Sequence, residues 1–98
     1  MSFWVRGKRF TSYLVDHHGS GRVELQCKAE RGLNAMLADR APDRFFMPPY
    51  MAHHGWIAMY LDVGAVPWDE VEAFITEAYQ LTAPRTLVKA LGSATTAD

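Results

Sequence analysis

Two adjacent histidine pairs, His17-His18 and His53-His54, are the residues of this sequence whose type could bind a metal ion. Asp16 and the one cysteine, Cys27, add a carboxylate and a thiol, so that the usual ligands of zinc and nickel are all present. Adjacent side chains on an extended backbone point to opposite faces, and each pair would therefore supply one ligand at most. No His-x-x-x-His or Cys-x-x-Cys spacing aligns two ligands. We expect no metal site and no bound cofactor.

The nucleophiles of the sequence lack neighbours that would activate them. Cys27 falls at an inward position of an alternating segment, where a cysteine usually serves as packing. The acidic residues Asp69, Glu70, Glu72 and Glu77 follow a helical surface. Such a surface is typical of a solvated face that complements the helix dipole, not of an acid–base pair. We expect no catalytic residues and a protein that is not an enzyme.

The distribution of charge favours contact with a polyanion. Residues 1–40 carry a formal charge of +3 and residues 41–98 a charge of −4, within a net charge of −1. Three cations crowd one predicted hairpin tip, which either is simply solvated or contacts DNA phosphates as a wing does. With so few cations, only weak and salt-sensitive DNA binding is expected. The candidate residues are Arg6, Lys8, Arg9, Arg22, Lys28 and Arg31.

An aromatic and proline-rich segment, Phe-Phe-Met-Pro-Pro-Tyr at residues 45–50, offers a second kind of site. Proline restricts the backbone, so the loop could line an apolar pocket whose polar tips orient a small ligand. Alternatively, the aromatic side chains anchor the core and the prolines only route the chain. The candidate ligand or protein-interaction residues are Tyr50, His53, His54 and Trp56.

Three aromatic or β-branched segments predict the strands that would position the first cations: residues 3–6, 9–15 and 23–27. The link Gly7-Lys8 suits a two-residue hairpin turn, because glycine tolerates positive φ. Residues 16–21 have the composition of a loop. Three strands with such short links form an antiparallel meander.

The third predicted strand alternates strictly between apolar and polar residues. This pattern predicts a buried face made of Val23, Leu25 and Cys27. It leaves Glu24 and Gln26 on the opposite face, in water.

The period then changes to that of a helix at residues 30–40, which would lay Leu33, Met36 and Leu37 on the sheet. Residues 42–55 contain three prolines and predict a loop, with a short extended piece at 44–47. The apolar run Trp56–Leu61 predicts an interior strand that is covered on both faces.

The clearest helix is predicted from Trp68 to about Thr82, with a proline before it and acidic residues in its first turn. Residues 85–91 would add a turn or two. The resulting order, β-β-β-α-β-α, describes an α+β fold in which helices flank an antiparallel sheet. We expect one domain over residues 1–91 and a disordered tail over 92–98.

Composition excludes several classes of protein. A chain of 98 residues that is 49% hydrophobic and 21% charged is typical of one small globular domain. Its near-neutral charge excludes a wholly basic nucleic-acid protein, and its one cysteine excludes an internal disulfide framework. No run is long enough to cross a membrane, and no signal pattern is present. We expect a cytoplasmic protein without a membrane partner.

Several segments of the chain resemble the MmcQ/YjbR-like family in their order and spacing. They are FWVRGKRF at 3–10, VELQCKA at 23–29, FFMPPY at 45–50 with GWIAMYLD at 55–62, and WDEV at 68–71 through Ala78-Tyr79. The resemblance implies a two-layer architecture related to that of type III secretion chaperones, and it carries over no catalytic residue. It also implies a DNA-binding double wing, formed here by the hairpins around Gly7-Lys8 and residues 17–21.

Members of that family usually have an N-terminal helix before the first strand, whereas this chain starts almost at the strand. Without that helix, part of the sheet would expose apolar surface, and such patches usually bind a partner. We predict a homodimer that buries this surface. The resemblance as a whole favours a small non-enzymatic module that contacts the DNA backbone, with a ligand-binding or protein-interaction module as the alternative.

Overall fold

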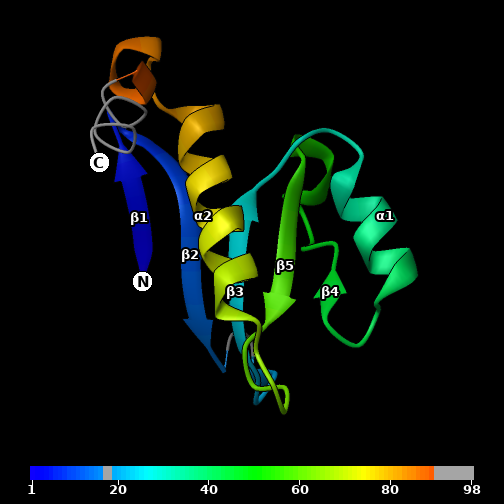
Figure 1. Cartoon of the computed structure of the whole chain (residues 1–98). Coiled ribbons are helices and arrows are strands. Elements are labelled where there is room, and N and C mark those ends of the chain that lie inside the picture. Colours follow the sequence, from blue (N-terminus) through cyan, green and yellow to red (C-terminus); the bar gives the residue numbers. More distant parts are fainter. Residues whose placement is uncertain (17–18, 90–98) are drawn as a thin grey trace.

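A five-stranded antiparallel sheet with helices packed against it makes up this α+β protein, as predicted (Figure 1). The computed structural model describes residues 1–16 and 19–89; the expected loop histidines His17-His18 and the expected tail at 92–98 lie outside them. Residues 85–89 form a further helical turn. The elements are β1 (Ser2–Val5), β2 (Lys8–Val15), β3 (Val23–Lys28), α1 (Leu33–Arg40), β4 (Phe45–Phe46), η2 (Ala52–His54), β5 (Trp56–Tyr60) and α2 (Trp68–Thr82).

The strands lie in the order β1-β2-β3-β5-β4. The first three form the predicted meander, and β5 is an interior strand because it pairs with β3 on one side and with the two-residue strand β4 on the other. The short helix η2 before β5 was not predicted. Among the described residues, no helix combines the length and the apolar character that a bilayer crossing requires.

The first hairpin turn lies one residue earlier than predicted. Val5 pairs with Lys8, so the turn residues are Arg6 and Gly7, whose φ angles are 50° and 78°. A two-residue hairpin turn with two positive φ angles matches the right-handed twist of the strands. Arg6 therefore adopts a left-handed conformation that L-residues seldom adopt.

A β-bulge follows this turn and changes the facing of β2. Trp4 lies opposite Arg9 and Phe3 lies opposite Thr11, which leaves Phe10 as an extra residue in β2. Phe10 packs against the hydrophobic core, with its ring 5.6 Å from that of Tyr79 in α2. The bulge thereby directs Arg9 to the face of the sheet opposite α2, since an extra residue shifts the alternation of the strand.

The core lies between the sheet and the helices. α2 packs across the sheet with Val71 and Ala78 buried, while α1 packs beside β4 and β5 (Figure 1). Of the predicted inward residues of β3, Leu25 and Cys27 are buried there, whereas Val23 at the start of the strand is only partly buried. The buried cluster consists of Leu25, Cys27, Ala29, Phe45, Ile57, Met59, Val71 and Ala78.

The expected inward face of α1 is partly wrong. Leu33 and Leu37 pack against the core, but Met36 is 41% exposed and Asn34 is buried in its place. The Asn34 amide donates hydrogen bonds to the carbonyl oxygens of Ala52 (2.9 Å) and Trp56 (3.0 Å). This polar connection between α1 and the start of β5 has no signature in hydrophobic spacing.

The expectation that Glu24 and Gln26 are in water is also wrong, because both are buried. β3 lies in the centre of the sheet with a neighbour on each side, and a central strand can be covered on both faces. On the face opposite α2, the two side chains lie in a hollow that aromatic residues of β4 and β5 help to line.

We predict that Gly55→Ala destabilises the protein more than Gly7→Ala. Both glycines have positive φ, but a Cβ at Gly55 would lie 2.9 Å from the carbonyl oxygen of Ala29, whereas nothing lies within 4 Å at Gly7. We expect a loss of about 1 kcal/mol at Gly7 and about 3 kcal/mol at Gly55, measured by urea unfolding. Equal losses would contradict the steric explanation.

Candidate functional site

The six cations predicted to bind DNA do not form one surface. The β1–β2 turn lies at one end of β2 and the β2–β3 loop at the other, because successive links of a meander alternate between the ends of the sheet (Figure 1). Eight residues of β2 separate them, roughly 26 Å of extended strand. Arg6, Lys8 and Arg9 therefore lie at one end of the sheet, and Arg22 lies at the other.

Other cations join the first three at their end of the sheet. β3 ends with Lys28 beside the start of β2, and Arg31 follows it; Phe10 near the start of β2 contacts Tyr79 near the end of α2. Residues 85–89 lie beyond the same end (Figure 1). We call this region the basic end; it contains seven of the ten lysines and arginines of the chain, namely Arg6, Lys8, Arg9, Lys28, Arg31, Arg85 and Lys89.

Among residues 1–16 and 19–89, none of these seven cations forms a salt bridge. The two salt bridges of that part of the chain, Arg22–Asp62 and Arg44–Glu70, involve the other end of the sheet. Within the described residues these cations are thus not paired with a carboxylate, although Glu30 lines the same hollow as Lys28 and Arg31.

Trp56 is not open to a ligand, contrary to the pocket hypothesis. It is 4% exposed, and the guanidinium of Arg9 lies 4.9 Å from the centre of its ring. Lys28 is the β3 partner of Trp56 in the register. This stacking restricts the position of Arg9 near Lys28. The N–H groups at the edge of the guanidinium plane can still donate hydrogen bonds to another acceptor.

His53 and His54 lie together, which corrects the expectation that their side chains point to opposite faces. Their backbone is the 3₁₀ helix η2 instead of an extended segment, and their ring centres are 3.9 Å apart. They line a hollow of about 630 Å³ with Lys28 and Arg31, so they belong to the basic end. In the part of the chain that the structure describes, no three His, Cys, Asp or Glu side chains are placed to hold a metal ion.

Tyr50 is the one predicted ligand residue that lines a different hollow. It is 90% exposed, with a φ of 68°, which is unusual for a bulky residue. It stands at the edge of a hollow of about 760 Å³ on the face of the sheet opposite α2, which we call the sheet-face pocket. Its lining is Arg9, Ser12, Leu14, Ser20, Arg22, Glu24, Gln26, Phe46, Pro49, Tyr50, Met51 and Tyr60.

The sheet-face pocket was not predicted as a unit. Alternation alone predicts that its central residues, Glu24 and Gln26, are in solvent, because they are the polar positions of the strand. The signal that was available is the alternation itself, which places Glu24 and Gln26 on one face. The alternation indicates a pocket only when it is combined with the positions of β5 and residues 45–51, which lie beside that face.

Arg22 is engaged within the fold and is not a free phosphate ligand. Its Nε and Nη2 donate hydrogen bonds of 2.9–3.1 Å to the carboxylate of Asp62, which also accepts one from the backbone N–H of Val23. The guanidinium lies 3.8 Å from the centre of the Tyr60 ring. The hydrogen bonds from Arg22 and Val23 lower the pKa of Asp62 to about 2.

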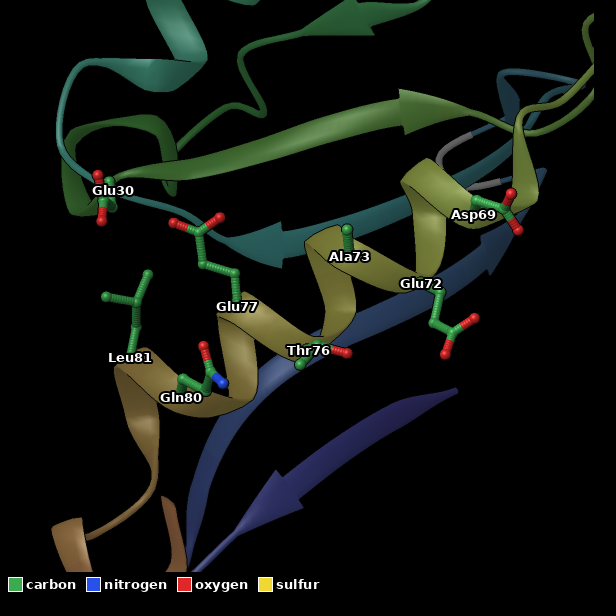
Figure 2. Close-up of a pocket in the computed structure, with 8 residues that line it drawn as sticks. All are labelled: Glu30, Asp69, Glu72, Ala73, Thr76, Glu77, Gln80 and Leu81. Atoms are coloured by element: carbon green, nitrogen blue, oxygen red, sulfur yellow. The ribbon is translucent and has the colours of Figure 1, made fainter. Parts of the chain in front are cut away.

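The acidic surface of α2 borders a shallow groove of about 580 Å³ (Figure 2). Figure 2 shows Glu77 and Asp69 at different points along α2, with Glu30 on a neighbouring segment, so the carboxylates of the helix are spread along it. This spread agrees with the predicted solvated face.

Cys27 is fully buried in the core, as predicted. Burial, with a smaller effect from the charge of Glu77, raises the pKa of its thiol to about 12. The thiol therefore stays protonated near neutral pH and serves as packing.

The comparisons with known proteins give one match. The YjbR family model matches residues 1–81. No curated protein and no solved structure matches the chain.

We predict that Asp62→Asn removes an acid-sensitive part of the stability. Because folding lowers the pKa of Asp62 from its ordinary 3.8 to about 2, its ion pair stabilises the fold fully above the ordinary pKa and loses this effect as the pH falls toward 2. In urea unfolding, the wild type should exceed the variant by a constant amount at pH 5–7, and the difference should shrink between pH 4 and 2. Asp39→Asn, at an exposed position of α1, is the control and should leave the pH profile unchanged. A wild-type advantage that persists undiminished at pH 2 would contradict this assignment.

Proposed function

The chain belongs to the YjbR family, and from this premise we propose that it is a small non-enzymatic protein that binds nucleic acid through phosphate contacts at its basic end. The observation that carries the proposal is the gathering of seven cations at one end of the sheet without salt bridges among the described residues. The burial of its one cysteine is compatible with a reducing compartment such as the cytoplasm.

The exposure of these cations supports contact with phosphates. Arg6, Lys8 and Arg31 are exposed, as are the two cations of residues 85–89. Phosphate contacts require reachable positive charge and no particular base, so they provide affinity without sequence specificity. The stacked Arg9 and the neighbouring Lys28 would add two cations whose positions the sheet already restricts.

The proposed interface uses one hairpin instead of two. In a double wing, both hairpins would contact the same duplex, but the β1–β2 turn and the β2–β3 loop lie at opposite ends of β2. Arg22, next to the second loop, is already paired with Asp62. We therefore assign the contact to the β1–β2 turn, the end of β3 and the residues that follow it.

The homodimer remains a prediction, and the edge of the sheet supports it. β1 is an edge strand, and its Phe3 and Trp4 are 43% and 61% exposed. Among the described strands none pairs with the outer side of β1, and such an edge with exposed rings offers both backbone groups and apolar area to a second copy.

We predict that exchanging two exposed cations of the basic end, Lys8→Glu with Arg31→Glu, weakens binding to duplex DNA by about tenfold or more at low salt. Fluorescence anisotropy with a labelled duplex would measure it. The slope of log affinity against log salt should fall by about two, because two phosphate contacts are lost.

The single variants Arg31→Glu and Arg40→Glu form a matched pair for this test. They make the same charge change just before and at the end of α1, and both residues are exposed, but Arg40 lies toward the other end of the sheet (Figure 1). Only Arg31→Glu should weaken binding. Equal losses, or no binding by the wild type at low salt, would reject the proposed interface.

For the dimer, we predict a sedimenting mass of twice 11.0 kDa at tens of micromolar. Trp4→Asp should shift the protein to the monomer, since it places a charge on the exposed ring position of β1. A wild-type chain that sediments as a monomer at that concentration would refute the dimer.

A further inference from the structure

Apart from nucleic acid, the geometry points to a second ligand: we propose that the sheet-face pocket binds a small organic cation, a primary ammonium on an aromatic body, with the ammonium at Glu24. This inference does not depend on the proposed nucleic-acid function. The pocket opens on the face of the sheet opposite α2, and its volume of about 760 Å³ lies within the range of small-molecule sites.

Glu24 is a buried carboxylate that forms no salt bridge among the described residues. It is 5% exposed. Its Oε1 accepts a hydrogen bond of 2.9 Å from the amide of Gln26. An ionised carboxylate can accept several hydrogen bonds, and buried charges are normally paired. The arrangement thus leaves acceptor capacity that a ligand ammonium would use.

The two arginines of the pocket do not meet this need. Arg22 is held by Asp62 through three hydrogen bonds and lies over Tyr60, and Arg9 lies over Trp56. Arg22 acts on Glu24 only through space, and neither arginine donates a hydrogen bond to its carboxylate. The acceptor positions of Glu24 are therefore left for a ligand ammonium.

Aromatic side chains border the same hollow. The rings of Phe46 and Tyr60 stack with their centres 4.9 Å apart, and both line the pocket with Tyr50. Tyr60 already stacks with Phe46 and has the guanidinium of Arg22 over its ring. Phe46 and Tyr50 are therefore the rings that would face an organic cation, and their area accommodates a flat apolar body. This lining selects an aromatic amine over a small inorganic cation.

Tyr50 provides an independent indication that the pocket edge has a function. It holds a left-handed backbone conformation that disfavours a bulky residue, and yet its side chain contributes little to the core because it is 90% exposed. Residues with a strained backbone concentrate at ligand sites, where the position of the side chain serves binding at some cost in folding stability.

The test compares two probes that share a phenol ring and differ in charge, tyramine and 4-hydroxyphenylacetate, by isothermal titration calorimetry on the whole chain. We expect saturable one-to-one binding of tyramine with a dissociation constant below about 10 mM, as befits a ligand of this size, and no binding of the acid. Absence of tyramine binding, or preference for the acid, overturns the proposal.

Glu24→Gln is the decisive variant, since it removes the charge and keeps the shape. Tyramine binding should weaken about tenfold or more, whereas Glu30→Gln, outside the pocket, should leave it unchanged. The melting temperature of Glu24→Gln should equal or exceed that of the wild type, because a buried unpaired charge is removed. A clear drop in melting temperature would mean that the carboxylate has a cationic partner within the fold, which overturns the proposal, as would undiminished binding.

Tyr50→Gly is a second test variant, and it changes an exposed side chain and no core residue. Glycine adopts positive φ without strain, so the fold should be retained and the melting temperature should not fall. Tyramine binding should weaken severalfold, while DNA binding at the basic end should be unchanged. Unchanged tyramine affinity would overturn the proposal, because the aromatic edge of the pocket would then not contact the ligand.

Discussion

The bulge at Phe10 sets the facing of β2, and the arrangement of both sides of the sheet depends on it. If β2 alternated without the extra residue, Phe10 would share the face of Ser12 and Leu14, and Arg9 would face α2. The bulge instead places Phe10 in the core against Tyr79 and brings Arg9 over Trp56. The one extra residue thus keeps the charged side chain of Arg9 out of the core and places it on the face of the sheet opposite α2.

Local sequence patterns predict most of the helices and strands, but they do not predict which faces of these elements other parts of the chain cover. The bounds of α2 follow from its proline, its acidic first turn and its apolar stripe, and the helix from Trp68 to Thr82 confirms them. The resemblance to the family likewise agrees with the family match. Alternation shows which side chains of a strand share a face, but not whether other parts of the chain cover that face. Glu24 is buried because β5 and β4, which are distant in sequence, lie beside β3 in the sheet.

Other misses have different physical causes. Asn34 is buried because its amide bonds two carbonyl groups, and hydrophobic spacing does not record hydrogen bonds. His53 and His54 lie together because η2 is helical, which a proline-rich segment does not indicate. The cations Lys28 and Arg31 were named individually. That they join the β1–β2 turn follows from strand order, and therefore from tertiary structure.

The separation of charge along the strands makes this molecule an electric dipole despite its net charge of −1. As a monopole it is weakly repelled by any polyanion, and salt screens this repulsion beyond about 10 Å. At shorter range the field of the polyanion exerts a torque on this dipole and turns the basic end toward the polyanion. The protein is therefore oriented before contact. The isoelectric point of 6.4 averages over both ends and conceals this polarity. Chains that dock in this way on one strand would direct the carboxylates of the opposite end outward, such as Asp62 and Asp69, and present them to whatever approaches next.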